Sequence, residues 1–556
     1  MRRCLLRWIG IVPFLGLLCQ VQAQEEATFV AKGEAKKVTE MGEKWRKGKG
    51  FLEGAGRRAP LYAGKSLGPR DFHVRARLSL KELAGTGAAF LIGGDIFGFD
   101  GEEKALFVEG ATFGKTHAVG KAESFITPGK PFLFEAVRAG SNLALRIDGK
   151  EVVSQPLGTG SVGPIGLRPW RGVMRVYDFS ASGNLEDVPQ QQRLFVSGEN
   201  GYHTYRVPSL VVGPEGALLA FCEGRKNGAG ETGNVDILLR RSQDGGKTWS
   251  EQQLVAGADD DHVWASPCAV VDKETGVVWL LTTWNRNDDT EEEIRSGASV
   301  DTRRVYVCSS KDDGKTWSES LEITPSVKRD NWTWYGTGPG AGIQLERNTP
   351  IKGFLFVPCN HTIEGDDKYF GSHLVYSPDH GESWSLGLAI GERNSEFELV
   401  ELADGGRMLN MRNRGEAKCR IISRTLRADE VDLSKPAKEP TIWSEPQPQI
   451  ELRDPHCQAS FRRYSFFDTG GRNRILFLNP ASETRDHMTL RLTYDEGATW
   501  PLSKLLYAGP SAYSGLAVLP DRSICCLYEA GIEEPDETIV FTRVTLEWLT
   551  DWRDWH

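Results

Sequence analysis

The chain has 556 residues, of which 39% are hydrophobic, and its 76 acidic and 67 basic side chains give a formal charge of −9. This length is sufficient for more than one domain with a buried core. An acidic chain is poorly suited to nucleic acid or to an anionic membrane surface, because both are polyanions. We therefore expect no nucleic-acid partner.

Residues 1–23 are predicted to be a secretory signal peptide. Three arginines in the first seven residues precede the apolar run 9–18, and small residues suited to cleavage follow at 21–23. The apolar run is too short to span a membrane and no later stretch approaches the required length, so we expect no membrane insertion. Removal of this segment deletes three arginines and no acids, which changes the formal charge to −12. A secreted or periplasmic location is expected.

Residues 24–187 predict a β-sandwich domain. Segments 72–78 and 143–147 alternate apolar and polar residues, and the second runs into the hairpin signal Asp148-Gly149. Many short strands with Gly-rich turns favour a sandwich. The region resembles the concanavalin-like jelly-roll domains often attached to carbohydrate-active enzymes, and both a glycan-binding role and a packing role fit it. The polar stretch 186–192 is the expected junction.

A short box with the pattern S/T-x-D-x-G-x-T/S-W recurs four times in residues 188–556. Its Asp can accept hydrogen bonds from backbone amides two residues on, and its Gly supplies a positive φ. We expect its Trp to pack the hairpin onto the sheet to which it belongs. The four copies end at Trp249, Trp317, Trp384 and Trp500.

The spacing of the boxes predicts the architecture. Successive copies are 68, 67 and 116 residues apart, and the last interval equals two intervals of 58. A period near 60 residues suits one four-stranded propeller blade, and a decayed copy is expected between Ser423 and Trp443. Residues 188–556 hold roughly six such periods. We predict an all-β protein in which a six-bladed β-propeller follows the N-terminal sandwich.

Eight of the ten cysteines lie in the predicted propeller, mostly in apolar segments. Because none shows C-x-x-C spacing, a zinc site is not expected. Buried free thiols are favoured over disulfides. The ten histidines form no metal-binding motif, and we expect no cofactor.

The first predicted blade opens with Tyr205-Arg206-Val207-Pro208, followed by Phe221-Cys-Glu-Gly-Arg225. With the boxes, over roughly residues 195–550, this resembles the bacterial exo-α-sialidases (neuraminidases), whose first blade carries a F/Y-R-I/V-P signature. The resemblance implies a retaining glycoside hydrolase that removes terminal sialic acids from glycans or glycoproteins.

The resemblance also implies an arginine triad for the sialic acid carboxylate. Arginine forks donate paired hydrogen bonds to a planar anion and stay charged at any working pH. The matching positions are Arg206, Arg412 in Met-Leu-Asn-Met-Arg412-Asn, and Arg485 in Asn-Pro-Ala-Ser-Glu-Thr-Arg485. Arg225 belongs to the same expected substrate site. Trp334 and its neighbour Tyr335, in a stretch that lines the family's pocket, are candidates for stacking on the sugar.

The family's tyrosine nucleophile matches Tyr513 in Gly-Pro-Ser-Ala-Tyr513-Ser. A phenol suits this substrate, because a carboxylate nucleophile would be repelled by the carboxylate beside the reacting carbon. Glu396 matches the base that accepts the phenol proton, although Glu398 and Glu401 lie close in sequence. Glu529 matches the acid that orients the first arginine.

The acid catalyst is the position at which this sequence departs from the family. Relatives carry an aspartate in a loop after the Glu-Gly-Arg segment, and here Glu231 occupies that position, with Asp236 as a second candidate. A longer side chain can misplace the proton donor, and an error of about 1 Å can cost about 100-fold in rate. Two alternatives therefore remain: a sialoglycan-binding propeller with weak or no turnover, and a hydrolase of a related nonulosonate such as a deaminated sialic acid.

Overall fold

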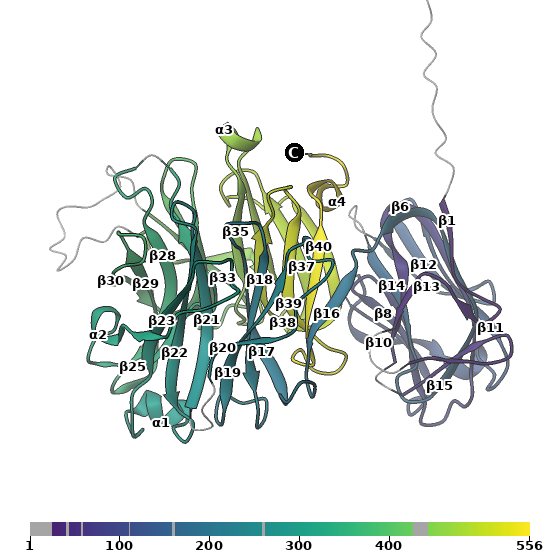
Figure 1. The fold of residues 1–556 in the computed structure, drawn as a ribbon. Coiled ribbons are helices and arrows are strands. Elements are labelled where there is room, and N and C mark those ends of the chain that lie inside the picture. Colours follow the sequence, from purple (N-terminus) through teal and green to yellow (C-terminus); the bar gives the residue numbers. More distant parts are fainter. Residues whose placement is uncertain are drawn as a thin grey trace, which may run out of the picture.

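The computed structural model describes residues 25–40, 44–56, 59–110, 112–157, 162–257, 262–347, 349–425 and 443–555. The predicted signal peptide and positions 426–442 of the expected decayed box lie outside these ranges. Figure 1 shows two β-rich bodies that lie beside each other, an N-terminal one in purple and blue and a larger one that ends in yellow. Among the described residues, no helix combines the length and apolar character needed to cross a bilayer.

In the described N-terminal residues, β1 to β15 form one 15-stranded sheet that curls around a single hydrophobic core. The long strands β6 and β15 pair with each other along most of their length. In β6, Phe72, Val74, Ala76 and Leu78 are buried, as the alternating pattern predicts. The strands are β1 (Glu25–Ala31), β2 (Glu34–Ala35), β3 (Val38–Glu40), β4 (Arg46–Lys47), β5 (Leu52–Ala55), β6 (Leu61–Leu80), β7 (Gly87–Ile92), β8 (Asp95–Asp100), β9 (Ala105–Gly110), β10 (Gly114–Lys121), β11 (Phe132–Ala139), β12 (Asn142–Ile147), β13 (Lys150–Pro156), β14 (Gly163–Arg168) and β15 (Val173–Asp187), with a short 3-10 helix η1 (Ala122–Ser124).

The larger body is a β-propeller whose described strands group into six four-stranded antiparallel units. The units are β17 (Thr204–Val212), β18 (Leu218–Arg225), β19 (Val235–Ser242) and β20 (Gln253–Ala256); β21 (His262–Asp272), β22 (Val277–Arg286), β23 (Arg304–Ser310) and β24 (Leu321–Glu322); β25 (Trp332–Thr337), β28 (Leu355–Ile363), β29 (Asp366–Ser377) and β30 (Ser385–Glu392); β31 (Asn394–Glu401), β32 (Arg407–Asn413), β33 (Cys419–Arg424) and β34 (Gln447–Arg453); β35 (Ser460–Ser465), β36 (Arg474–Pro480), β37 (Asp486–Thr493) and the first half of β38 (Leu502–Val518); and the second half of β38, β39 (Ile524–Ala530), β40 (Thr538–Val544) and β16 (Gln191–Val196). Short elements complete the propeller: β26 (Gly340–Ala341), β27 (Ile343–Gln344), α1 (Glu291–Ser296), α2 (Thr324–Val327), α3 (Phe467–Gly470) and α4 (Leu546–Thr550).

The last unit joins the two ends of the propeller sequence. Strand β16 pairs with β40, so residues that begin the propeller complete the sheet that ends it. The first strands of neighbouring units, among them β17, β31 and β38, contact strands of the next units and lie nearest the propeller axis. Side chains at the ends of these inner strands can therefore meet across the axis.

In all four boxes the Asp carboxylate accepts hydrogen bonds from the backbone N–H and the hydroxyl of the Thr or Ser four positions on. In the first, the Asp244 carboxylate accepts bonds from the backbone N–H of Lys247 and of Thr248, each 2.9 Å, and from the Thr248 hydroxyl at 2.6 Å. These bonds favour the ionised form and hold the pKa of Asp244 below its usual value. The turn mechanism predicted from the sequence is thus present.

Each tryptophan of the first three boxes packs against a hydrophobic cluster that contains residues of its own unit and of a neighbouring unit. Trp249 lies edge-on to Phe541 in the last unit, with ring centroids 4.9 Å apart, and Trp384 meets Trp279 of the preceding unit at 6.1 Å. The neighbouring unit supplies the aromatic partner of these tryptophans. Trp500 does pack on Phe477 of its own unit, at 5.7 Å. Most boxes therefore join adjacent units.

The box glycine explains this contact. Gly381 has φ of +96°, and a Cβ atom there would lie 2.1 Å from the indole of Trp279. The glycine is needed both for its backbone conformation and for the close approach of the neighbouring unit. All eight cysteines in the described residues are buried and unpaired, as the sequence favours.

Side-chain contacts fasten the two bodies together. Lys504 Nζ forms an ion pair with Glu186 at 2.9 Å, and the Trp548 indole N–H donates to the carbonyl oxygen of Asp187 at 3.2 Å. Strand β15 ends at Asp187 and β16 begins at Gln191, so only three residues separate the two sheets. Such a short connection restricts the relative movement of the two bodies.

Candidate functional site

Register irregularities at the ends of inner strands present several of the candidate side chains. Shifts in pairing occur at 206–209 in β17, 265–268 in β21, 332–335 in β25, 394–397 in β31 and 511–514 in β38. Trp334, Glu396 and Tyr513 lie inside three of these shifts. A β-bulge turns a side chain out of the regular ladder, which explains how residues of closely packed inner strands reach a shared site.

Tyr513 is the centre of the site. Its hydroxyl donates to Glu396 Oε1 at 2.5 Å, and Arg412 Nη1 donates to the Tyr513 oxygen at 2.9 Å and to Glu396 Oε2 at 2.5 Å. Strand β31 supplies Glu396, β32 supplies Arg412 and β38 supplies Tyr513. The structure therefore brings together three residues that the sequence placed in one site from motifs that span 117 positions of the chain.

Arg206 and Arg485 lie on the ring of Tyr513. Their guanidinium carbons are 5.3 Å and 5.7 Å from the ring centroid. Arg206 comes from β17, and Arg485 directly precedes β37. Together with Arg412, three guanidinium groups from three different units surround one phenol, as the sequence predicts.

Glu529 holds two of these elements at once. Its Oε1 accepts from Arg206 Nε at 2.7 Å and from the backbone N–H of Val207 at 2.8 Å, and its Oε2 accepts from the backbone N–H of Tyr513 at 3.1 Å. Val207 has φ of +58°, a region that a β-branched residue occupies at a cost of about 1–3 kcal/mol. The buried Glu529 carboxylate fixes this strained turn, so its role extends beyond the orientation of Arg206 expected from the sequence.

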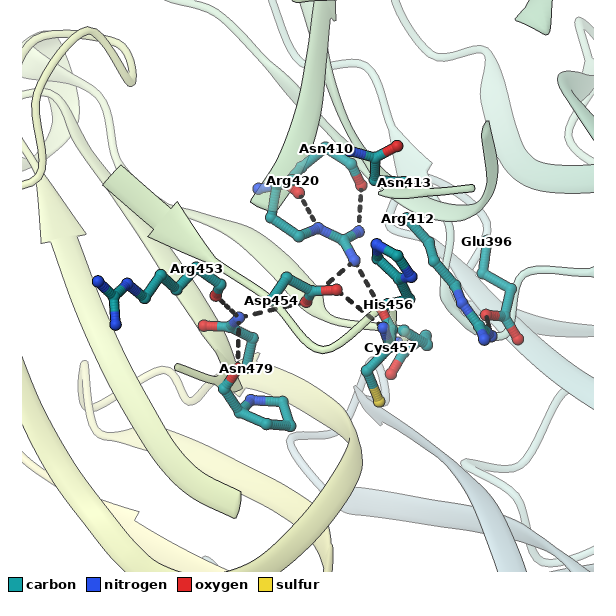
Figure 2. Close-up of polar contacts among 12 residues, drawn as sticks. Glu396, Asn410, Arg412, Asn413, Arg420, Arg453, Asp454, His456, Cys457 and Asn479 are labelled. Carbon is teal, nitrogen blue, oxygen red and sulfur yellow. Dashed lines mark hydrogen bonds and ion pairs between the residues drawn. The ribbon is translucent and has the colours of Figure 1, made fainter. Parts of the chain in front are cut away.

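A buried polar network supports the opposite side of the site (Figure 2). Arg420, which is fully buried, donates to Asn410 Oδ1 at 2.6 Å and to the carbonyl oxygen of Cys457 at 2.5 Å, and it pairs with Asp454 at 3.4 Å. Asp454 in turn accepts from the backbone N–H of Cys457 at 2.8 Å. Because Cys457 packs against Tyr513, the network connects strands β32 and β33 to the floor of the site.

The electrostatic environment favours an ionised Glu396 beside a neutral Tyr513. Burial raises the pKa of Glu396, but the charges of Arg412 and Arg414 outweigh it and leave the pKa below its usual value. Burial and the adjacent Glu396 carboxylate raise the pKa of Tyr513 far above its usual value. In this resting state the phenol keeps its proton and Glu396 is the acceptor for it.

Arg414 is a site residue that the sequence analysis missed. It donates from Nε to the Ser395 hydroxyl at 2.8 Å and lies over the ring of Phe370 at 4.2 Å. It follows Arg412 by two positions, so strand alternation could have placed both on one face of the chain. It gives Glu396 a second cationic neighbour.

Glu231 lies apart from Tyr513, among a different set of cations. Its carboxylate is 3.7 Å from Arg225 and 3.7 Å from Arg303, and its side chain is 41% exposed. Arg225 itself is buried and committed to Glu223, which accepts from its Nη2 at 2.6 Å. No hydrogen bond or ion pair joins Glu231 to Tyr513 or Glu396 among the described contacts.

Trp334 lies on this second side, half-buried beneath Arg303, whose guanidinium carbon is 3.7 Å from the ring centroid. Arg303 is a second residue that the sequence did not reveal, because no motif surrounds it. Tyr335, offered with Trp334 as a stacking candidate, is fully buried and donates to the carbonyl oxygen of Val327 at 3.3 Å. It belongs to the core and cannot reach a ligand.

The neighbouring carboxylates have other partners. Glu398 is fully buried and accepts from the backbone N–H of Ala341 at 2.9 Å and of Phe461 at 2.7 Å. Asp236 accepts from the hydroxyl of Tyr202 at 2.7 Å. These hydrogen bonds give Glu398 and Asp236 structural roles. Glu396 is therefore the carboxylate that contacts Tyr513.

Comparison with known proteins defines the class of this fold. A family profile described as "BNR repeat-like domain" matches residues 216–526, which is more than half of the chain. The chain therefore belongs to the BNR repeat-like family. The proteins to which it is similar include sialidases from bacteria.

A sialidase of Micromonospora viridifaciens is 35% identical over 376 residues, which cover 66% of this chain and 55% of the relative. A sialidase of Bacteroides fragilis is 28% identical over 60% of this chain and 62% of its own length. The chain thus spans less than two thirds of the length of these two relatives. Among solved structures, the Hadza microbial sialidase Hz136 has a TM-score of 0.58 at 22% identity and covers 87% of this chain and 94% of its own. A leech intramolecular trans-sialidase has a TM-score of 0.55 at 15% identity, over 90% of this chain and 99% of its own. These two structures share the fold.

Proposed function

We propose that the protein is a retaining exo-α-sialidase that hydrolyses terminal sialic acids of glycoconjugates. The observation that carries the proposal is the Tyr513 hydroxyl, which donates to Glu396 while Arg206, Arg412 and Arg485 surround it. Three arginine cations suit a substrate that has a carboxylate on its reacting carbon. The curated relatives named sialidase support the same activity.

The first chemical step is attack by Tyr513. The three arginines bind the substrate carboxylate and place the anomeric carbon beside the phenol oxygen. The phenol oxygen forms a bond to that carbon as its proton passes to Glu396, over the 2.5 Å hydrogen bond. The bond to the glycosidic oxygen breaks, and Glu231 gives that oxygen a proton.

The second step reverses the first. Glu231, now ionised, takes a proton from a water molecule, whose oxygen bonds to the anomeric carbon. The bond to the Tyr513 oxygen breaks, and Glu396 returns the proton to the phenol. Two displacements at one carbon retain its configuration. Sialic acid and the leaving alcohol are the products.

A fluorogenic aryl sialoside tests the activity. We expect the wild type to release the aryl group and Tyr513→Phe to lose at least on the order of 10³-fold in kcat, because the nucleophilic oxygen is gone. Tyr528→Phe, a buried tyrosine of the same sheet whose hydroxyl faces Thr542, is the matched control. NMR of the first-formed sialic acid should show the α-anomer. First formation of the β-anomer would contradict the double displacement.

A second candidate is a sialoglycan-binding propeller with weak or no turnover. The exposed side chain of Glu231 and its two arginine neighbours favour it, since they hold the proposed acid in an ion-paired position. Under this reading the wild type is inert on the aryl sialoside, yet calorimetry detects sialyllactose binding. Gain of hydrolysis in Glu231→Asp would identify the altered acid as the cause. A deaminated sialoside in the same assays tests the related-nonulosonate alternative.

We also propose that the chain is exported, on the basis of the charged and apolar pattern of residues 1–23. Mass spectrometry of the protein from its natural host should find a mature chain that begins at Gln24. A cytoplasmic protein that retains these residues would contradict the proposal.

A further inference from the structure

A cavity of about 570 Å³ lies between the two bodies of the molecule. Ile96, Glu109 and Arg168 line it from the N-terminal sheet, and Arg206, Arg485 and Asp536 line it from the propeller. Its volume falls within the range of about 300–1,000 Å³ that is usual for small-molecule sites. The cavity therefore joins the N-terminal body to two arginines of the candidate site.

Arg206 and Arg485 show where the cavity lies relative to Tyr513. Each guanidinium lies within 6 Å of the Tyr513 ring centroid, at 5.3 Å for Arg206 and 5.7 Å for Arg485. Tyr513 and Arg412 do not line the cavity, so it lies to one side of the phenol. In a sialoside, the carboxylate and the glycosidic oxygen are attached to the same carbon. A hexose attached through that oxygen is therefore within reach of a space beside the carboxylate-binding arginines.

The walls suit neutral sugars. Ile96 and Glu109 are cross-strand neighbours in β8 and β9, so an apolar surface and a hydrogen-bond acceptor stand next to each other. Asp536 on the opposite wall adds an acceptor and Arg168 adds donors. Sugar rings present both hydroxyl groups and apolar C–H faces, and this mixture of side chains can contact both.

The two walls are held at a fixed separation near the cavity. His487, which lines it, donates from Nδ1 to Asp486 at 2.5 Å, and its Nε2 is 3.3 Å from the carbonyl oxygen of Gly94 in the N-terminal body. The rings of Tyr62 and Tyr507 meet across the same junction at 6.4 Å. The cavity is thus a preformed feature of the junction between the bodies.

From these observations we infer that the cavity is a subsite for the sugars of the leaving group, and that the N-terminal body supplies one of its walls. The inference rests on the proposed sialidase function. It assigns the N-terminal body a direct part in the choice of substrate: neutral hexoses attached to sialic acid bind between the two bodies. An aryl sialoside, which lacks those hexoses, does not use this wall.

Kinetics with two substrates test the subsite. We expect Ile96→Trp, which fills the cavity from the N-terminal wall, to lower the ratio of kcat/KM for 3′-sialyllactose to kcat/KM for the aryl sialoside by about tenfold, mainly through KM. Glu103→Gln, an exposed side chain of the same β8–β9 hairpin outside the cavity lining, should leave the ratio unchanged. An unchanged ratio in Ile96→Trp, or equal losses on both substrates, would overturn the inference.

Binding separates this inference from the proposed activity. In a Tyr513→Phe background, or in the wild type if that proves inert, calorimetry should give 3′-sialyllactose a Kd about tenfold lower than that of the methyl sialoside. The difference should disappear in Ile96→Trp. If the protein is inert but shows this difference in Kd, the proposed activity is refuted and the subsite is supported. If the protein is active but the two Kd values are equal, the activity is supported and the subsite is refuted.

Discussion

The two sides of the candidate site differ in how firmly their side chains are held. On one side, Tyr513, Glu396 and Arg412 form a closed set of hydrogen bonds of 2.5–2.9 Å, and the Glu396 and Arg412 side chains are only 12% and 11% exposed. On the other, Glu231 is 41% exposed and reaches its nearest cations, Arg225 and Arg303, at 3.7 Å.

The folded protein alone positions the groups on the first side, whereas the carboxylate on the second side must still be positioned when substrate binds. In the proposed mechanism, anion binding and nucleophile activation depend on groups fixed by burial and short bonds, so these groups are organised before substrate arrives. The same mechanism assigns proton delivery to the leaving group to Glu231, a loop residue with solvent access. A loop position also allows Glu231 to exchange protons with water between the two chemical steps.

The fixed side should be intolerant of even a conservative change. We expect Arg412→Lys to reduce kcat/KM by about 10²–10³-fold, because an ammonium cannot contact Glu396, Tyr513 and a carboxylate with the geometry of a planar fork. Steady-state kinetics measure the effect. Arg453→Lys is the matched control, since the exposed Arg453 side chain points away from the site in Figure 2. A loss no larger than that of the control would break the contrast between the two sides.

The exposed side should respond according to the leaving group. Glu231→Gln removes the proton donor, so we expect a loss of about 10²-fold on 3′-sialyllactose and a much smaller one on an aryl sialoside, whose leaving group needs little protonation. Glu292→Gln, an exposed side chain of α1, serves as control. Equal losses on the two substrates would assign Glu231 to binding in place of proton transfer.

The pH profile sharpens the comparison further. Glu396 must be ionised to accept the phenol proton, and its lowered pKa keeps it ionised below its usual titration range. Arg414→Gln removes one of the two cations that oppose burial, so the pKa of Glu396 should rise. The acid limb of kcat/KM should then move to higher pH, while the plateau changes less. A limb that stays in place would exclude Arg414 as a determinant of Glu396 ionisation.

The smallest effect on catalysis is expected from the boxes on the outside of the propeller. Gly381→Ala brings a methyl group against Trp279 in a backbone conformation with positive φ, and should lower the free energy of unfolding by about 3 kcal/mol. Gly365→Ala has a similar φ of +79° but open space around it, and should cost about 1 kcal/mol. Denaturant unfolding measures both. Equal costs would show that contact between units adds nothing to the conformational strain.

Much of the candidate site could be predicted from the sequence, because its residues lie in short motifs. Arg206, Glu396 and Tyr513 can each be assigned from adjacent residues in the sequence, and the structure places Arg206 and Glu396 against the Tyr513 side chain. The boxes could be predicted equally well as turns, since the Asp and Gly requirements are local. The packing of their tryptophans was predicted only in part, because the aromatic partners of Trp249, Trp317 and Trp384 lie in another unit and leave no pattern near the box.

Other features depend on contacts that a linear pattern does not encode. Arg303 and Arg414 have no motif, and they matter because folding brings them to Glu231 and Glu396. The cavity beside Arg206 requires two bodies whose relative position is set by scattered pairs such as Lys504 and Glu186. Periodicity predicts each sheet separately and carries no information on how the sheets meet.

Strand β16 has a consequence for how the protein is made. It is synthesised before the rest of the propeller, yet its partner β40 (Thr538–Val544) follows all the other propeller strands in sequence. During translation β16 must wait, with its backbone groups unpaired, until β40 has been synthesised. A nascent chain stalled before residue 538 would carry an open ring, and a premature stop codon shortly before that residue would be as damaging to the ring as one far upstream.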